Sequence, residues 1–269
     1  LGDVYKRQAL FFMMGMGVFG QGFVGKLAFP SANVSDRIEK TFTSVNFNMM
    51  IMVIYALITI AIFGMWYYAR YEGNFLPSPK KTFNPMMLVA IVILVPGTQF
   101  AANFIANLTG YIRPDWLQQY NELFETSGIT DTTFVTVLYS VILAPICEEL
   151  IFRGVTMRCA RKALPFALAN LMQAALFGLF HLNWIQGIYA FALGIVLGYV
   201  CERGGSIYYS MGLHLLFNLW GTLSGFFPDP GNSVVVFVVV IVVTIVSLVA
   251  GFVLFNKGRR KLPINSTGI

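Results

Sequence analysis

The chain has 269 residues, of which 57% are hydrophobic and only 11% are charged. A soluble domain averages about 25% charged residues, so this sequence has too little polar surface to enclose its apolar segments in water. The net charge of +6 comes from basic residues scattered near the ends of apolar segments, so we expect no nucleic-acid partner. Composition therefore predicts an all-α, polytopic transmembrane helical bundle in a lipid bilayer.

The apolar segments predict about eight membrane spans, because a helix needs about 20 apolar residues to cross the hydrocarbon core. The third segment contains Pro96, where we expect a kink. The polar stretch after it spaces Trp116, Leu117 and Tyr120 as an amphipathic surface helix would. The expected spans are residues 9–29, 47–69, 85–107, 132–158, 163–183, 184–201, 206–227 and 233–255.

The basic residues predict the orientation of these spans. Every second loop is basic, whereas the alternate loops are neutral or acidic. Basic loops stay on the cytoplasmic side, so we expect both termini in the cytoplasm. The basic residues of these loops are Arg70, Lys80, Lys81, Arg158, Arg161, Lys162, Arg203, Lys257, Arg259, Arg260 and Lys261.

Three parts are expected along the chain. Residues 1–131 would hold the N-terminal spans and the amphipathic segment, 132–226 a catalytic core of spans four to seven, and 227–269 the last span and a basic tail. Residues 1–8, LGDVYKRQ, look non-native and are left out of the fold prediction. No internal repeat is evident, which argues against a transporter built from two repeated halves.

Ionisable residues within the apolar segments are few and concentrated. Each costs about 2.5–3.5 kcal/mol at the centre of a bilayer, which makes it a candidate for function. The chain has two histidines, and both fall in predicted spans. The amide Asn218 is added to the candidates because it follows His214 by one helical turn. The candidates are therefore Glu148, Glu149 and Arg153 in the fourth span, His181 in the fifth, and His214 and Asn218 in the seventh.

Helix geometry relates some of these residues to one another. Glu149 and Arg153 are four residues apart and can pair along one helix face. Glu148 and Glu149 differ by about 100° around the helix, so we expect one to face a cavity and the other to pair with Arg153. If the fourth and fifth spans form a hairpin near Lys162, Glu148 and His181 lie about 21 and 28 Å from the turn.

A carboxylate beside two imidazoles supports two kinds of chemistry. The three groups can hold a metal such as zinc with water in the open position. Alternatively, the carboxylate acts as a general base on a water while His and Asn side chains donate hydrogen bonds to an oxyanion. Both alternatives activate water for attack on a carbonyl, so both predict hydrolysis.

Three short runs carry a family resemblance. EELIFR (148–153), FGLFH (177–181) and HLLFN (214–218) resemble the E-E-x-x-x-R, F-x-x-x-H and H-x-x-x-N motifs of the CAAX prenyl endopeptidase and bacteriocin-processing family of intramembrane metalloproteases, also called Abi or CPBP. The motifs occur in the family's order, on separate predicted spans, within 132–226.

The resemblance implies a role for each motif position. Glu148 and His181 would orient and activate the hydrolytic water, and His214 and Asn218 would stabilise the oxyanion or complete a metal site. The remaining two positions, Glu149 and Arg153, would brace the site.

The resemblance also implies a cofactor, a substrate and a location. Glu148, His181 and His214 would bind a divalent metal, which we expect to be zinc. The substrate would be a peptide or protein in or at the membrane. In the prenyl branch of the family it would be a C-terminal tripeptide after a lipidated cysteine. The resemblance places the protein in a bacterial cell membrane.

Two other functions remain open at this point. A membrane scaffold or immunity-type binding protein could retain the motifs for stability, because histidines also hydrogen-bond between membrane helices. A transporter could use a Glu–His proton relay. Gly187, Gly194 and Gly198 are interpreted as close-packing positions rather than site residues.

Overall fold

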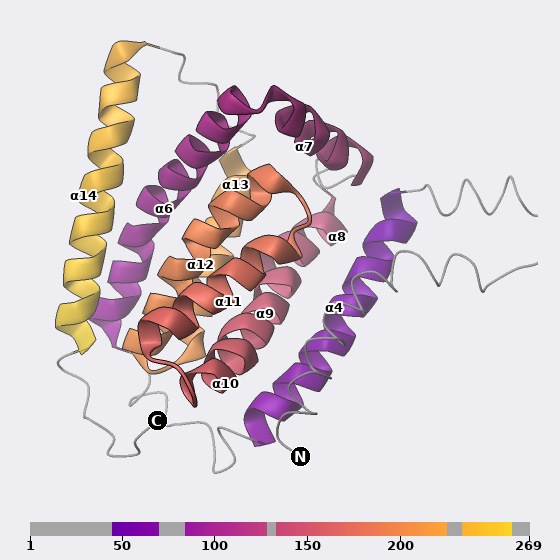
Figure 1. The fold of residues 1–269 in the computed structure, drawn as a ribbon, viewed down its shortest axis with the longest axis vertical. Coiled ribbons are helices and arrows are strands. Elements are labelled where there is room, and N and C mark those ends of the chain that lie inside the picture. Colours follow the sequence, from indigo (N-terminus) through magenta and orange to yellow (C-terminus); the bar gives the residue numbers. More distant parts are fainter. Residues whose placement is uncertain (1–44, 70–83, 128–132, 225–232, 260–269) are drawn as a thin grey trace, which may run out of the picture.

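The computed structural model describes residues 45–69, 84–127, 133–224 and 233–259, and this part of the chain is an all-α bundle (Figure 1). The elements with α-helical or π-helical geometry are α4 (Val45–Tyr67), α6 (Pro85–Ile112), α7 (Pro114–Ser127), α8 (Phe134–Val137), η2 (Leu138–Leu143), α9 (Ala144–Glu149), η3 (Leu150–Met157), α10 (Arg158–Arg161), α11 (Phe166–Phe180), α12 (Trp184–Gly204), α13 (Ile207–Ser224) and α14 (Val234–Arg259).

Helices occupy the positions of all the predicted spans except 9–29, which lies outside the described residues. Within the described ranges, four helices are long and apolar enough to cross a membrane: Pro85–Ile112, Phe134–Arg161, Trp184–Gly204 and Val234–Arg259. Two apolar helices are shorter, Ile51–Tyr67 and Phe166–Phe180. The protein is therefore an integral multi-pass membrane protein, with four candidate spans in the described part.

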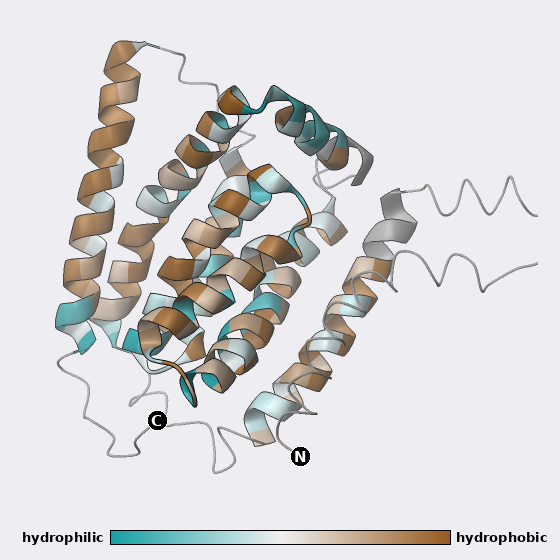
Figure 2. Ribbon diagram, viewed as in Figure 1, coloured by the Kyte–Doolittle hydropathy of each residue, from teal (hydrophilic) through white to brown (hydrophobic). Residues whose placement is uncertain are grey.

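The outer surface of the bundle matches a lipid environment. α14 packs along α6 at the edge of the bundle (Figure 1) and exposes a row of valines, including Val235, Val242 and Val249. Figure 2 shows this helix in brown over most of its length, whereas α7, which crosses one end of the bundle, is largely teal. The prediction of an amphipathic helix after the third span is confirmed by α7.

Helix α6 continues through Pro96 with help from α14. The Ser247 hydroxyl accepts a hydrogen bond from the N–H of Gly97 at 2.8 Å and donates one to the carbonyl of Ile93. These two backbone groups are one helical turn apart, so the serine hydroxyl bridges them. Gly97 permits this approach, because a Cβ there would lie 2.7 Å from the Ser247 oxygen.

The bundle has two chemically different ends. At the basic end, α10, α12 and α14 finish and α13 begins. It carries Arg158, Arg161, Lys162, Arg203, Lys257 and Arg259. At the opposite end, the α7 end, α6, α11 and α13 finish and α12 and α14 begin, with α7 lying across them (Figure 1).

We predict that Ser247→Ala lowers the stability of the protein more than Thr244→Val does. Alanine removes the hydroxyl that bonds to the Gly97 N–H and the Ile93 carbonyl. Loss of the partner of a buried polar group lowers the free energy of unfolding by about 1–3 kcal/mol. The Thr244 hydroxyl bonds only to the Val240 carbonyl of its own helix, so its removal should have little effect. Thermal unfolding in detergent measures the difference, and equal midpoints for the two variants would contradict it.

Candidate active site

The fourth predicted span is one helical rod with two π-helical stretches, η2 and η3, which flank Glu148 and Glu149. In η2 the N–H of Ala144 bonds to the Tyr139 carbonyl five residues earlier, and Pro145 has no N–H to offer the Ser140 carbonyl. Asn218 of α13 donates to that carbonyl through Nδ2 at 2.8 Å. π-Helical turns often occur at functional sites. Here Asn218 of the third motif is hydrogen-bonded to a carbonyl of such a turn.

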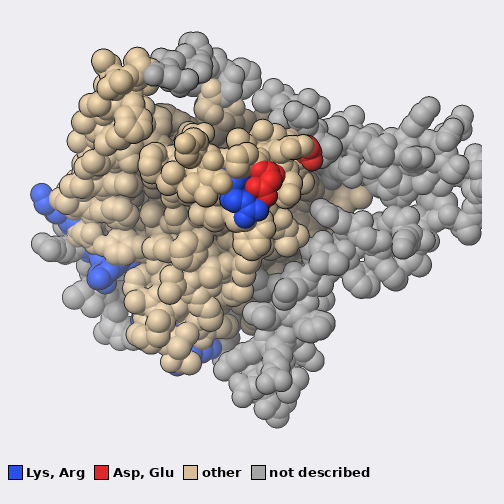
Figure 3. All heavy atoms as spheres, turned by 45° about the horizontal axis from the view of Figure 1, so that its top comes forward, with Lys and Arg blue, Asp and Glu red and all other residues tan. Residues whose placement is uncertain are grey.

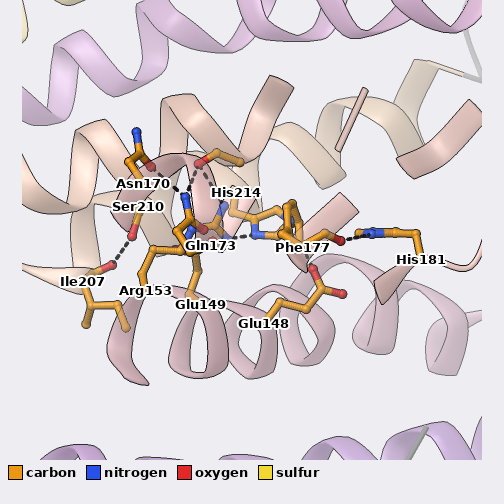
Figure 4. A network of polar contacts seen from close by, with 11 residues as sticks. Glu148, Glu149, Arg153, Asn170, Gln173, Phe177, His181, Ile207, Ser210 and His214 are labelled. Atoms are coloured by element: carbon orange, nitrogen blue, oxygen red, sulfur yellow. Dashed lines mark hydrogen bonds and ion pairs between the residues drawn. The ribbon is translucent and has the colours of Figure 1, made fainter. Parts of the chain in front are cut away.

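Glu149 and Arg153 form a fully buried ion pair along this rod. Arg153 Nη1 donates to Glu149 Oε1 at 2.8 Å, and both side chains have zero exposure. The same oxygen accepts from His214 Nδ1 at 3.0 Å (Figure 4). The predicted pairing of Glu149 with Arg153 is thereby confirmed, and it extends to the first histidine of the third motif.

A second layer of polar groups surrounds the arginine. Arg153 Nη2 donates to the Gly194 carbonyl at 3.2 Å, and its guanidinium lies 4.5 Å from the centroid of the Phe177 ring. Gln173 Nε2 donates to the same carbonyl at 2.8 Å and to Asn170 Oδ1 at 2.7 Å. A buried charge is tolerated only when such partners replace water, so these residues hold the guanidinium in place.

Glu148 occupies a different environment from its neighbour. Its side chain is 14% exposed, and Oε2 lies 3.6 Å from Nε2 of His214. The two adjacent carboxylates therefore face opposite nitrogens of one imidazole. Glu149 is enclosed by its partners, whereas Glu148 is partly exposed. This difference agrees with the prediction from their 100° separation around the helix that only one of them pairs with Arg153.

His181 lies at the C-terminus of α11, with Nδ1 2.8 Å from the carbonyl oxygen of Phe177. A carbonyl oxygen only accepts, so Nδ1 carries the proton, and Nε2 of the neutral ring has the lone pair. The ring of Phe177 contacts both imidazoles, with centroids 4.9 Å from His181 and 5.7 Å from His214. The next residue, Leu182, has a φ of 52°, an uncommon backbone conformation for leucine.

The donor set resembles that of a metal site in its chemistry. Each imidazole uses Nδ1 on an acceptor, the Phe177 carbonyl or the Glu149 carboxylate, and so directs Nε2 elsewhere. Metal-binding histidines are oriented by hydrogen bonds of this kind. However, among the described residues no three His, Cys, Asp or Glu side chains lie close enough together to hold a metal ion.

The structure brings most of the predicted site residues together. Glu148, Glu149, Arg153 and His214 form one connected cluster, and His181 joins it through Phe177. Asn218 lies one turn beyond His214, where its amide binds the Ser140 carbonyl.

Sequence reasoning missed Gln173 and Asn170, which complete the layer around the arginine. Their signal was present: they are the two amide side chains of an otherwise apolar helix, α11. Gly194 and Gly198 are close-packing positions, as predicted, because a Cβ at either would lie within 3.1 Å of α11 atoms. The carbonyl of Gly194 has a further role as the acceptor shared by Arg153 and Gln173.

We predict that Arg153→Met destabilises the protein strongly, because it leaves the buried Glu149 carboxylate without its cation. Breaking a buried pair in this way costs about 3–5 kcal/mol. Arg161→Met is the matched control, since Arg161 pairs with Glu202 at 3.1 Å but both side chains are over 20% exposed. Partly exposed pairs contribute about 0–1 kcal/mol.

Thermal unfolding of the two single variants and of Glu149→Gln/Arg153→Met measures the coupling. The double variant should be more stable than Arg153→Met alone, because it removes the unpaired charge. An additive loss of stability would contradict a coupled pair.

Comparison with known proteins identifies one domain of the chain. Residues 130–220 match the family model described as Rce1-like, type II CAAX prenyl endopeptidase Rce1-like. This stretch is about a third of the chain and contains all six predicted site residues. No curated protein and no solved structure matches the chain. Residues 130–220 therefore form a domain of the Rce1-like type II CAAX prenyl endopeptidase family, which is a family of proteases.

Proposed function

We propose that the protein is an intramembrane endopeptidase that hydrolyses a peptide bond of a membrane-associated or lipidated peptide or protein with a water activated by Glu148 and His181. The observation that carries this proposal is the unequal pair of carboxylates. Glu149 is bound by Arg153 and His214, whereas Glu148 is partly exposed and faces Nε2 of His214. A general base needs access to water, which the partial exposure of Glu148 would allow.

The reaction can be followed atom by atom. Glu148 takes a proton from water while the water oxygen attacks the peptide carbonyl carbon. His181, whose Nδ1 is held by the Phe177 carbonyl, accepts a hydrogen bond from that water at Nε2. The tetrahedral intermediate then collapses, the C–N bond breaks, and the proton held by Glu148 passes to the leaving amine. The products are a carboxylate and an amine.

His214 and Asn218 would stabilise the oxyanion of the intermediate. The Glu149 carboxylate accepts from His214 Nδ1 and so orients the ring with Nε2 toward Glu148. A doubly protonated His214 would donate to the oxyanion through Nε2–H. Asn218 lies on the same helix one turn later, and Nδ2 has a second hydrogen besides the one directed at the Ser140 carbonyl. Glu149 and Arg153 would brace both helices.

A divalent metal, with zinc the leading candidate, would be held by Glu148, His181 and His214. When bound, such an ion lowers the pKa of its water to about 7. Both histidines use Nδ1 on an acceptor, which leaves Nε2 of each ring as the atom that would bind the ion, and this supports the assignment.

We further propose a topology of eight spans in a bacterial cell membrane with both termini in the cytoplasm. Spans four to seven, within 132–226, would form the catalytic core, flanked by 1–131 and 227–269. The basic residues at one end of the bundle support this orientation.

Glu148→Gln should abolish cleavage of a pool of quenched-fluorescent peptides, with a loss of about 100-fold or more for removal of a general base. The unfolding temperature should remain close to that of the wild type. Glu148 is partly exposed and lies 3.6 Å from His214, whereas Glu149 is held by a 2.8 Å bond from Arg153. Glu122→Gln on α7 is the control and should cleave normally. Wild-type cleavage by Glu148→Gln would instead favour a non-enzymatic scaffold.

Chelation tests the metal assignment. The purified protein should contain zinc by elemental analysis, and His181→Ala and His214→Ala should each reduce that content at least several-fold. A chelator should abolish cleavage, and added zinc should restore it. Full cleavage by metal-free protein would leave Glu148 as a general base acting without a metal.

A further inference from the structure

We propose that Leu182 is a positioning residue, whose left-handed backbone conformation holds the His181 imidazole in place in the site. The role of His181 in activating water rests on the proposed function. The constraint that Leu182 imposes on the backbone depends only on the fold.

The backbone at Leu182 is unusual for this residue type. Leu182 follows α11 and its C-cap, His181, and has a φ of 52°. In the described part of the chain, it is the single residue other than glycine with a positive φ. In this left-handed region, the Cβ of an L-amino acid lies too close to the following carbonyl oxygen. Glycine is therefore the common residue at this position of a helix end.

The end of α12 has the same conformation, but with glycine. Gly205 has a φ of 66° there. Among the described residues, apart from its neighbours in the chain, no atom lies within 4 Å of an added Cβ. The conformation, and not a lack of space, therefore favours glycine at the end of α12. The end of α11 carries leucine in the same conformation.

The Leu182 side chain does not offset this strain by packing. It is 83% exposed, so it buries little apolar surface against the protein. Strained residues of this kind cluster at functional sites, where the surrounding structure maintains them. What distinguishes leucine from glycine here is the narrow range of φ and ψ that its Cβ permits. Once the turn has formed, leucine therefore restricts its motion.

Two hydrogen bonds hold the end of α11 in this conformation. The His181 N–H donates to the Gly178 carbonyl at 3.3 Å, and the Leu182 N–H donates to the Leu179 carbonyl at 3.1 Å. Both bonds belong to the last turn of the helix, where helices otherwise fray. The backbone of His181 is therefore held through its own N–H and through that of Leu182.

The start of α12 is held just beyond the turn. Asn183 is its N-cap, and the side-chain oxygen accepts from the Gln186 N–H at 3.1 Å. Trp184 stacks on Trp116 of α7, with ring centroids 5.3 Å apart. Figure 3, which turns the α7 end forward, shows few charged atoms among the described residues of this face. Ring and backbone contacts thus hold α12 here.

Glycines bring α11 and α12 into close backbone contact beside the turn. A Cβ at Gly178 would lie 2.5 Å from the carbonyl oxygen of Gly187, and a Cβ at Gly187 would lie 2.9 Å from that of Gly178. The two helices therefore have little freedom to slide at this point. The three residues between them, 181–183, must reverse the chain across a fixed gap, and the left-handed conformation of Leu182 achieves this.

The imidazole of His181 is held through its own helix. Nδ1 lies 2.8 Å from the carbonyl oxygen of Phe177, and the ring contacts the rings of Phe177 and Phe180. Figure 4 shows His181 at the edge of the polar cluster, beyond Phe177. Catalytic groups must be held within about 0.5 Å of their productive geometry. The last turn of α11, closed by Leu182, supplies this restraint.

Leu182→Gly should separate stability from activity. Glycine removes the left-handed strain, so the thermal unfolding midpoint in detergent should stay the same or rise. Glycine also widens the range of φ and ψ in the turn. For one quenched-fluorescent peptide that the wild type cleaves, kcat should therefore fall about 5-fold or more, because small displacements of a catalytic group are costly. KM should change less than about 2-fold, since substrate binding is not what the substitution alters.

Two substitutions that keep a Cβ serve as controls. Asparagine tolerates the left-handed region better than most residues, and alanine removes the same exposed apolar atoms as glycine does. Leu182→Asn and Leu182→Ala should both retain kcat within about 2-fold of the wild type. Loss of kcat in these variants equal to that in Leu182→Gly would assign the effect to the side chain and overturn the proposal. A lowered unfolding midpoint for Leu182→Gly would also overturn it.

Gly205→Ala is the reverse change at the end of α12. Because the space around the added Cβ is open, this variant measures left-handed strain alone. Its unfolding midpoint should fall, whereas its kcat should match that of the wild type, because Gly205 lies at the basic end of the bundle. An unchanged midpoint would show that the conformation carries no strain, which would remove the basis of the proposal.

Hydrogen exchange tests the turn without any need for activity. The His181 and Leu182 amides, which bond to the Gly178 and Leu179 carbonyls, should lose protection about 5-fold or more in Leu182→Gly. They should keep it in Leu182→Asn. Protection factors, which allow for the different intrinsic exchange rates of the variants, are the quantity to compare. Equal protection in the wild type and in Leu182→Gly would contradict the proposal.

The two proposals fail in different ways. Loss of protection in Leu182→Gly with no cleavage by the wild type would reject the peptidase and leave the constraint of Leu182 on His181. Cleavage by the wild type and by Leu182→Gly with equal kcat would reject the positioning role and leave the peptidase.

Discussion

The buried pair of Glu149 and Arg153 is the interaction on which the rest of the site depends. It places a full charge of each sign in a part of the protein with zero exposure, where an unpaired charge would be untenable. Three helices meet on it. The pair itself lies on the fourth span, the Gly194 carbonyl comes from α12, and His214 comes from α13. Because each partner is held by another helix, the imidazole of His214 has one preferred orientation, with Nε2 toward Glu148.

Much of this arrangement follows from simple spacing in the sequence. The four-residue separation of Glu149 and Arg153 and the 100° offset of Glu148 are properties of any helix, and the structure retains both. The positions of the helices follow from the length of the apolar runs. Such features are predictable because they depend on neighbours in the chain and on the bilayer, not on which helices pack together.

Other features depend on contacts between distant segments and could not be predicted. The amides of Gln173 and Asn170 matter because Gly194 and Ile195 of α12 place carbonyls beside them. The bond from Asn218 to Ser140 exists because a π-helical turn and Pro145 leave that carbonyl available. Similarly, Ser247 acts on α6 across 150 residues of sequence. In each case, the polar group is evident in the sequence, but its partner is set by packing.

The π-helical stretch η2 makes the fourth span sensitive to its length rather than only to its composition. A π turn accommodates an additional residue within the helical ladder, and η2 does so just before Glu148. Deletion of one residue from Leu138–Leu143 would let the ladder revert to α geometry, but it would turn the preceding part of the rod by about 100° relative to the carboxylates. The Ser140 carbonyl would then leave Asn218, or Glu148 would leave His214. Substitutions in this stretch can preserve the site, whereas insertions and deletions cannot, so its residue count is itself a constraint on how the sequence can vary.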